Sequence, residues 1–300
     1  MNVLLCGDLD AAEWREWHQA LSTAMPEARW LDVAAARAAP ATVQAAVVAN
    51  PPPGSLQGLP ALRLIQSLWA GVDRLLADTT LPAGAPIARM VDPAMNAAMA
   101  ETVLWAVLSL HRGFFAYARR QREGRWQPHA QRRADEVRVL VLGQGQMGRT
   151  AAARLAQQGY ALSHWRRDGS PLQPLLAQAH IVVNLLPLTP DTRGLLDQRF
   201  FAALRPKASV VNLARGAHVV DADLLAALDS GHLRHAVLDV FHTEPLPPGH
   251  AYWQHPRVTV LPHAAAATDA RSAAAVAVAN LRAARDGLPL QHQVDIGRGY

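Results

Sequence analysis

The fold is decided by Val137-Arg138-Val139-Leu140-Val141-Leu142-Gly143-Gln144-Gly145-Gln146-Met147-Gly148. A valine-rich apolar run ends there in the pattern G-x-G-x-x-G, and residues 149–158 continue with a helical pattern. Strand, glycine turn and helix in this order are typical of a dinucleotide site, where the first glycine makes the turn and the second admits a pyrophosphate. The third glycine lets the helix pack on the strand, and the helix N-terminus faces the phosphates. A tight turn without a ligand is the plainer alternative.

The next predicted strand, residues 160–165, ends in Arg166-Arg167 instead of the acidic residue with which NAD sites hold the ribose. Asp168 follows in what reads as a turn. Two guanidiniums can pair with a 2′-phosphate that an acid would repel. We therefore expect NADPH as the preferred cofactor and NADH as a second one, the alternative being that both arginines are solvated loop charges.

The composition narrows the class of protein. The chain has 300 residues, half of them apolar, and a net charge of +5 that arginine carries almost alone, which suits one large or two medium domains. The arginines are scattered and no aromatic-basic module accompanies them, so we expect no nucleic-acid partner. Cys6 is the single cysteine, which argues against a disulfide framework and a cysteine metal site.

Neither a secretory leader nor a membrane span is expected. Asp8 and Asp10 come too early for a leader, and no apolar run approaches the ~18 residues that cross a bilayer. A cytoplasmic location is the simplest interpretation. Among the thirteen histidines, His232 and His235 are close in sequence, but no Cys or acid cluster joins them, so we expect no metal.

Short apolar strands alternate with helical segments along the chain, which predicts an α/β fold with parallel sheets covered on both faces. We expect two Rossmann-like or flavodoxin-like domains with doubly wound sheets. The first covers residues 1–93 plus 268–300, because 268–286 reads as a helix that returns to it, and the dinucleotide domain covers 94–267. The predicted strands are 3–6, 45–49, 62–68 and 86–91, then 137–142, 160–165, 181–186, 209–213, 235–240 and 258–261.

A long helix is predicted over residues 95–120, with one apolar stripe at helical spacing and further apolar residues beside it. Leu104, Leu108 and Phe115 lie off the stripe. A helix that is apolar on more than one face is buried on more than one side, so we expect it to pack on its own domain and on a partner subunit. Burial within one chain is the alternative. A second helix is expected from Asp221, with this aspartate as a plausible N-cap.

Ligands of such sheets bind beyond the carboxyl ends of the strands. In the second domain Arg215, Glu244 and His263 each follow a different strand. Reduction of a 2-oxo acid needs a hydride for the carbonyl carbon and a proton for its oxygen, and histidine can supply that proton near neutral pH. A carboxylate on its other nitrogen would favour the imidazolium, and an arginine can hold the substrate carboxylate. The spacing alone does not show that the three residues meet.

These motifs resemble the D-isomer-specific 2-hydroxyacid dehydrogenases over residues 67–266, as glycine loop, arginine motif 212–216, glutamate motif 239–247 and histidine motif 262–265. The resemblance implies Arg215, Glu244 and His263 as the catalytic set, an active site in the cleft between the domains, and a homodimer joined through the nucleotide domains. The expected cofactor contacts are Gly143, Gly145, Gln146, Met147, Gly148, Arg166, Arg167, Leu186, Pro187, Thr192, Ala214, Asp239, His263 and Ala265.

Residues 67–73 are similar to the family's substrate loop, which implies that the backbone N–H groups of Ala70 and Gly71, next to Trp69, receive the substrate carboxylate together with Arg215. Trp69 replaces the small residue usual there, and either its indole changes the size of the pocket or it turns away into the packing of the domain. The short chain and Arg166-Arg167 look like the glyoxylate/hydroxypyruvate reductase subgroup, with a small 2-oxo or 2-hydroxy acid as substrate. The alternatives are a corepressor-like dinucleotide sensor without turnover, and formate oxidation, for which a His–Glu pair would be superfluous.

Overall fold

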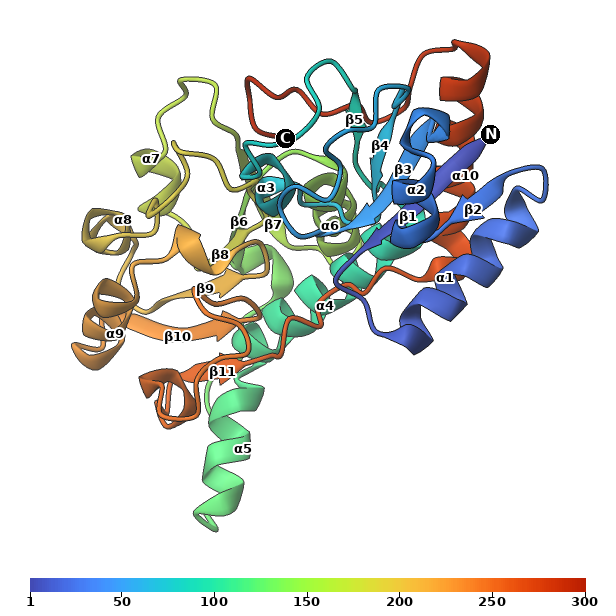
Figure 1. Cartoon of the computed structure of the whole chain (residues 1–300). Coiled ribbons are helices and arrows are strands. Elements are labelled where there is room, and N and C mark those ends of the chain that lie inside the picture. Colours follow the sequence, from blue (N-terminus) through green and yellow to red (C-terminus); the bar gives the residue numbers. More distant parts are fainter. The chain divides into compact units, whose positions relative to one another are not determined.

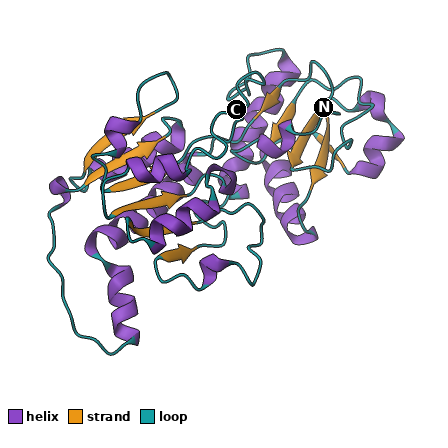
Figure 2. Cartoon of the chain, turned by 90° about the vertical axis from the view of Figure 1, so that its left-hand side faces the viewer, coloured by secondary structure: helices purple, strands orange, loops and turns teal.

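A computed structural model describes residues 1–300, and the chain folds as two compact units (Figure 1). Unit 1 comprises residues 1–95 and 268–300, and unit 2 comprises residues 96–267. The first unit thus extends to Met95 instead of ending at residue 93. Each unit is a parallel sheet with helices around it (Figure 2), so the predicted α/β class with two parallel sheets is confirmed.

Unit 1 holds a five-stranded parallel sheet in the order β2-β1-β3-β4-β5. The central strand β3 is buried along its whole length because helices cover both faces. Its elements are β1 (Asn2–Gly7), α1 (Ala11–Ala24), β2 (Arg29–Leu31), α2 (Val33–Ala38), η1 (Pro40–Thr42), β3 (Ala45–Ala49), β4 (Ile65–Ser67), α3 (Asp73–Leu76), β5 (Ile87–Ala88) and α10 (Ala270–Asp286).

The C-terminal helix α10 is fixed to this sheet by a buried amide. Asn280 donates to Oε1 of Gln66 at 2.8 Å and to the Gln291 carbonyl at 3.0 Å, and its own oxygen accepts the Gln291 N–H at 2.8 Å. Both Asn280 and Gln66 are fully buried. Because a buried polar group must find partners inside the protein, this one amide ties β4, α10 and the C-terminal segment together.

Unit 2 holds a six-stranded parallel sheet in the order β11-β10-β9-β8-β6-β7. The chain enters at β6, adds β7 on one side and then β8 to β11 on the other, so the switch point lies between β6 and β8. Its elements are α4 (Pro93–Arg112), of which residues 93–95 belong to unit 1, α5 (Phe114–Arg122), η2 (Ala134–Glu136), β6 (Arg138–Leu142), α6 (Gln146–Ala156), β7 (Ala161–Trp165), α7 (Gln173–Leu176), β8 (Ile181–Asn184), α8 (Gln198–Ala203), β9 (Ala208–Asn212), η3 (Gly216–His218), α9 (Asp221–Asp229), β10 (Leu233–Leu238), η4 (Ala251–Trp253) and β11 (Val258–Val260).

Alternate residues of the strands feed two hydrophobic clusters, one on each face of this sheet. In β10, Val237 joins the cluster that contains α4 and α6, whereas Ala236 and Leu238 join the cluster that contains α8 and α9. The sheet is therefore buried on both faces, and only its two ends remain open for a ligand.

The predicted long helix over residues 95–120 is wrong in one respect, because it is two helices. α4 ends at Arg112, Gly113 adopts a left-handed conformation with φ +75°, and α5 starts at Phe114. The apolar stripe ends with the break, since Phe114 is 52% exposed. A non-glycine residue at position 113 would be strained in this conformation.

α9 does begin at Asp221, but Asp221 is not its N-cap as predicted. Val220 occupies that position without a side-chain hydrogen bond, and the Asp221 carboxylate accepts the hydroxyl of Tyr252 at 2.8 Å. The short edge strand β2 also escaped prediction, because three residues carry no usable period.

By length and mean hydropathy α4 could cross a bilayer, which differs from the expectation that no segment comes close. Half of that apolar window is buried inside the fold. Met99, Val103, Ala106 and Leu110 pack into the cluster on one face of the unit 2 sheet. Packing in the core of unit 2 therefore accounts for the buried half of this helix.

Replacing Asn280 with Ala should lower the free energy of unfolding by about 2–3 kcal/mol, because Gln66 and the Gln291 backbone lose buried partners. Urea unfolding at neutral pH measures the change. Gln19→Ala on the exposed side of α1 is the control and should leave stability nearly unchanged. Equal stability of the two variants would show that the amide does not anchor α10.

Candidate active site

The glycine loop joins β6 to α6 at the switch point of the unit 2 sheet. Gly143 has φ +104°, and a Cβ atom there would lie 2.6 Å from the Leu185 carbonyl oxygen; one on Gly148 would lie 2.1 Å from the Gly143 oxygen. At Gly145 nothing lies within 4 Å of that position. The loop thus packs tightly at its first and third glycines and is open at its second.

Gly145 is also the N-cap of α6, whose first turn contains Gln146 and Met147. No side chain caps this helix end, so its first N–H groups and the positive end of the helix dipole are available to an anion. An open glycine beside a helix N-terminus fits the pyrophosphate of a dinucleotide.

The turn with Arg166 and Arg167 lies beside this loop, since the Gly143 N–H donates to the Trp165 carbonyl at 2.9 Å. Nε of Arg166 is 2.6 Å from Oδ2 of Asp168, and Arg167 donates to the Asp191 carbonyl at 2.6 Å. Hydrogen bonds from Ser170 and Arg166 lower the pKa of Asp168 to about 2. Both guanidiniums are exposed, so each is held by a solvent-screened contact that a phosphate could replace.

The loop after β8 is fixed by its own polar groups. The Leu186 N–H donates to Oδ1 of Asn184 at 3.2 Å, and the hydroxyl of buried Thr192 donates to the Pro187 carbonyl at 2.7 Å. The ring nitrogens of fully buried His218 lie 3.2 Å from the carbonyl oxygens of Pro187 and Arg215. His218, to which the sequence pattern assigned no role, therefore joins the loops that follow β8 and β9.

Two buried asparagine side chains and one backbone hydrogen bond connect the carboxyl ends of β8, β9 and β10. Asn184 donates to Oδ1 of Asn212 at 3.0 Å, which also accepts the Ala214 N–H at 3.3 Å. The Asp239 N–H donates to the Asn212 carbonyl at 3.0 Å. The sequence pattern assigned no role to the two asparagines, and the only available signal was an amide at the last position of each buried strand.

Asp239 holds the segment that contains His263. Its two carboxylate oxygens accept the N–H groups of Ala264 at 2.7 Å and Ala265 at 3.0 Å, and its carbonyl accepts the His263 N–H at 2.9 Å. Burial raises the pKa of Asp239, while the two N–H bonds act in the opposite direction. His263 itself has φ +55°, a left-handed conformation that this anchoring imposes on a non-glycine residue.

His263 and Glu244 form a hydrogen-bonded ion pair. Nδ1 of His263 lies 2.6 Å from Oε2 of Glu244, and Oε1 accepts the Phe241 N–H at 2.8 Å. The hydrogen bond to Glu244 raises the pKa of His263 above its ordinary value despite partial burial. Burial raises the pKa of Glu244, but the hydrogen bonds from His263 and Phe241 outweigh it and lower that pKa overall.

Arg215 belongs to the same group of charges. Its positive charge lowers the pKa of both Glu244 and His263. Arg215 donates to the Ala214 carbonyl at 2.8 Å, and Asn212 donates to the Arg215 carbonyl at 2.9 Å. Gly216 is packed against Phe241, because a Cβ on it would lie 2.0 Å from the Phe241 carbonyl carbon. The structure thus brings Arg215, Glu244 and His263 together at the carboxyl edge of one sheet.

Trp69, Ala70 and Gly71 belong to unit 1 and follow β4. Ser67 Oγ accepts the Trp69 N–H at 3.0 Å, and the Trp69 carbonyl accepts the Met90 N–H at 3.0 Å. The backbone N–H groups of Ala70 and Gly71 donate to no acceptor within the chain. This loop therefore offers two adjacent backbone donors beside a fixed tryptophan backbone.

The histidines that invited a metal interpretation have other partners. His232 bonds the Phe201 carbonyl at 2.9 Å, and His235 bonds the hydroxyl of Thr259 at 2.8 Å. The structure places no group of three or more His, Cys, Asp or Glu side chains where they could hold a metal ion.

A glycine loop open to a pyrophosphate, an imidazole–carboxylate pair and an arginine, all at the carboxyl edge of one doubly wound sheet, define the class of α/β dehydrogenases. The family model described as "D-isomer specific 2-hydroxyacid dehydrogenase, NAD binding domain" matches residues 104–265. The chain belongs to this family and is a 2-hydroxyacid dehydrogenase.

Curated relatives and solved structures support the same family. The chain is 37% identical over the whole length of both chains to a glyoxylate/hydroxypyruvate reductase A from Serratia proteamaculans. It is 36% identical to the protein of that name from Yersinia enterocolitica, covering 96% of this chain and 97% of the relative.

A D-isomer specific 2-hydroxyacid dehydrogenase from Xanthobacter autotrophicus, solved with NADPH and MES, has a TM-score of 0.93 at 39% identity and covers 100% of this chain and 99% of its own. An NADPH-dependent glyoxylate/hydroxypyruvate reductase from Sinorhizobium meliloti, solved with NADP and sulfate, has a TM-score of 0.92 at 33% identity with the same coverage.

Glu244→Gln should lower the pKa of His263, because the amide keeps the shape of the side chain but removes the charge that stabilises the imidazolium. A titration of the imidazole signals by NMR measures it, with Glu16→Gln on α1 as control. In the native protein the raised pKa of His263 stabilises the fold below its unfolded pKa of about 6.5, and this contribution disappears as the pH rises through the folded value. An identical His263 titration in both variants would contradict the pairing.

Proposed function

We propose that the protein reduces a small 2-oxo acid, glyoxylate or hydroxypyruvate, to the 2-hydroxy acid with NADPH. The observation that carries the proposal is the 2.6 Å contact between His263 and Glu244 beside Arg215, on the sheet edge that also bears the glycine loop. The names of the relatives from Serratia and Sinorhizobium support the substrate class and the cofactor.

His263 is the proposed proton donor. With Nδ1 bonded to Glu244, the other ring nitrogen, Nε2, is left to donate to the carbonyl oxygen of the substrate. The raised pKa keeps more of the imidazole protonated near neutral pH, so the proton is available while the alkoxide forms. Glu244 fixes the ring through its second contact, to the Phe241 N–H. Bound NADPH supplies the hydride that the carbonyl carbon receives.

Arg215 is the proposed holder of the substrate carboxylate. A guanidinium forms two parallel hydrogen bonds to a carboxylate and its charge favours the developing alkoxide nearby. The unpaired N–H groups of Ala70 and Gly71 are proposed as additional donors to that carboxylate. Trp69 in this loop would restrict the side chain of the 2-oxo acid, which favours the small glyoxylate and hydroxypyruvate.

The glycine loop, with Gln146 and Met147 at the helix N-terminus, is proposed to hold the pyrophosphate of NADPH. Arg166 and Arg167 are proposed to hold the 2′-phosphate by exchanging their exposed aspartate contacts for it. The further proposed contacts lie at the strand ends, at Leu186, Pro187, Thr192, Ala214, Asp239, His263 and Ala265. The solved complexes with NADPH and NADP support the cofactor, and NADH remains a second one.

The protein is proposed to be a cytoplasmic homodimer whose two subunits contact each other through unit 2. In Figure 1, α5 extends away from the sheet of its own unit. Trp105 on α4 and Phe114 on α5 are 41% and 52% exposed, and Trp126 beyond α5 is 99% exposed. Large apolar side chains exposed on neighbouring helices are typical of surfaces that a second copy covers.

The alternative from another class is a dinucleotide sensor that binds cofactor without turnover. The complete set of Arg215, Glu244 and His263 favours the enzyme. Loss of NADPH absorbance when glyoxylate, hydroxypyruvate, pyruvate or phenylpyruvate is added distinguishes the two functions. Cofactor binding without absorbance loss on any of the four acids would favour the sensor.

His263→Ala should lower kcat for glyoxylate reduction by roughly 10²–10⁴-fold, because the proton donor is removed. The affinity for NADPH should stay within a few-fold, since the glycine loop is untouched. Steady-state rates and fluorescence titration of NADPH measure the two quantities, with His18→Ala on α1 as control. Turnover near the native value would remove His263 from the mechanism.

The double substitution of Arg166 with Ala and Arg167 with Asp should shift the NADPH/NADH ratio of kcat/KM toward NADH by roughly 10–100-fold, because two charge-assisted contacts to the 2′-phosphate are lost. Asp168, released from Arg166, can then accept hydrogen bonds from a ribose. The control is Arg15→Ala with Arg63→Asp, which changes the net charge by the same amount at exposed positions of unit 1. An unchanged NADPH/NADH ratio of kcat/KM would show that the two arginines do not bind the 2′-phosphate.

A further inference from the structure

The amino-terminal edge of the unit 2 sheet, opposite the site described above, is strongly basic. Arg138 is the first residue of β6, Lys207 directly precedes β9, Arg234 is the second residue of β10, and Arg257 directly precedes β11. Because the strands are parallel, these starts lie along one edge of the sheet. Residues far apart in sequence thus place their charges in one row.

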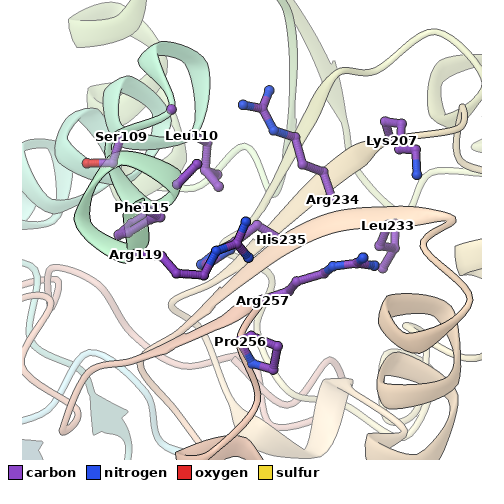
Figure 3. A pocket seen from close by; sticks show the side chains of 12 residues that line it. Ser109, Leu110, Phe115, Arg119, Lys207, Leu233, Arg234, His235, Pro256 and Arg257 are labelled. Carbon is purple, nitrogen blue, oxygen red and sulfur yellow. The ribbon is translucent and has the colours of Figure 1, made fainter. Parts of the chain in front are cut away.

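A cavity of about 200 Å³ lies at this edge, beneath α5 (Figure 3). Arg119 of α5 and Lys207, Arg234 and Arg257 at the strand starts line it, with the Arg234 side chain extending away from Arg257 and Lys207 (Figure 3). No aspartate or glutamate lines it. The cavity is therefore lined by four permanently charged cations from separate elements and by no carboxylate.

Two of these cations are positioned but not neutralised. Lys207 Nζ donates to the Gly231 carbonyl at 2.7 Å, and Arg257 donates to the Leu228 carbonyl, both near the C-terminal end of α9. A Cβ atom on Gly231 would lie 3.3 Å from Nζ of Lys207 and 3.3 Å from a guanidinium nitrogen of Arg257. The two cationic groups are therefore no further apart than twice that distance. The carbonyl dipoles at a helix C-terminus orient such groups and offset only part of their charge.

The other two cations also lack a strong carboxylate partner. No acidic side chain lies within ion-pair distance of Arg234. Arg119 contacts Glu123 only at 3.7 Å, and that glutamate makes its shorter contact, 2.9 Å, with Arg125. Ion pairs of this exposed kind compensate little charge.

The remaining wall is aromatic and uncharged. The rings of Phe115 and His235 stack with centroids 4.6 Å apart and an angle of 1°, and His235 bonds the Thr259 hydroxyl. Burial, together with Arg234, lowers the pKa of His235 to about 4, so this ring is neutral at physiological pH. It adds a rigid wall and a hydrogen-bonding edge without a fifth permanent charge.

We propose that this cavity binds a small anion with several closely spaced anionic oxygens, such as pyrophosphate or a tricarboxylate. Guanidinium and ammonium groups that line one cavity without a carboxylate are donors that phosphate and carboxylate oxygens accept from. About 200 Å³ equals the volume of roughly six or seven waters and lies below the pockets of larger ligands, so the ligand is smaller than a nucleotide. Such an anion would join α5 to the starts of β9, β10 and β11.

Calorimetric titration of inorganic pyrophosphate into the NADPH-loaded protein at constant ionic strength tests the proposal, since the cofactor keeps pyrophosphate from the glycine loop. One pyrophosphate should bind per chain, and citrate should compete with it. The double variant Arg119→Gln, Arg234→Gln should bind at least ten-fold more weakly. Arg15→Gln with Arg63→Gln removes the same charge from exposed positions of unit 1 and should bind as the native protein does.

Equal affinity of the native protein and the Arg119/Arg234 variant would overturn the proposal, as would an equal loss in the Arg15/Arg63 control. Arg119→Lys with Arg234→Lys keeps the charge and should recover part of the affinity; if the Gln pair does not fold, Arg234→Gln alone replaces it. Sedimentation separates a subunit contact from an anion site. Dissociation of the Gln variant with unchanged pyrophosphate affinity would assign the charges to a partner chain and contradict the anion site.

Discussion

The arrangement of residues at the carboxyl edge of the unit 2 sheet depends on one buried carboxylate, that of Asp239. Asp239 accepts the N–H groups of Ala264 and Ala265 with its side chain, and its carbonyl accepts that of His263. A buried carboxylate is unfavourable unless its oxygens are hydrogen-bonded, and here the donors are the backbone of the histidine segment. The cost of burying Asp239 therefore becomes a constraint on where His263 can lie. Asn184 and Asn212 extend this constraint to the ends of β8 and β9.

The two ends of the unit 2 sheet differ in their electrostatics. At the carboxyl end, Glu244 and His263 form a hydrogen bond that raises the pKa of His263 and lowers that of Glu244, and the charge of Arg215 lowers both pKa values. At the amino end, Arg119, Lys207, Arg234 and Arg257 line a cavity without a carboxylate, and among them only Arg119 has an acidic neighbour, Glu123 at 3.7 Å. One sheet thus carries, at its carboxyl end, the group that we propose moves a proton and, at its amino end, the cations that we propose attract an anion. Because the strands are parallel, the two groups lie at opposite ends of the sheet, one strand length apart.

Much of the fold could be predicted because buried parallel strands are nearly continuous apolar runs and the glycine loop marks the first of unit 2. The break between α4 and α5 at Gly113 could not be predicted, because a single glycine is tolerated in a helical pattern and its φ of +75° depends on packing. Arg215, Glu244 and His263 were identifiable because each follows a strand end. Asn184, Asn212 and the anchoring of the histidine segment by Asp239 were not, because a polar residue at a strand end looks the same whether it terminates the strand or bonds its neighbour. The basic amino-terminal edge could not be predicted either, because its cations are far apart in sequence and come near one another only when the strands pair in the sheet.

The central claim is that His263, held by Asp239 and charged through Glu244, delivers the proton to the substrate oxygen. The most direct test compares two curves on the native protein: the pH dependence of kcat/KM for glyoxylate reduction, and the NMR titration of the His263 ring. We expect the rate to fall as the pH rises through the same, raised pKa at which the ring loses its proton. A rate that stays constant while the His263 ring titrates would contradict the account.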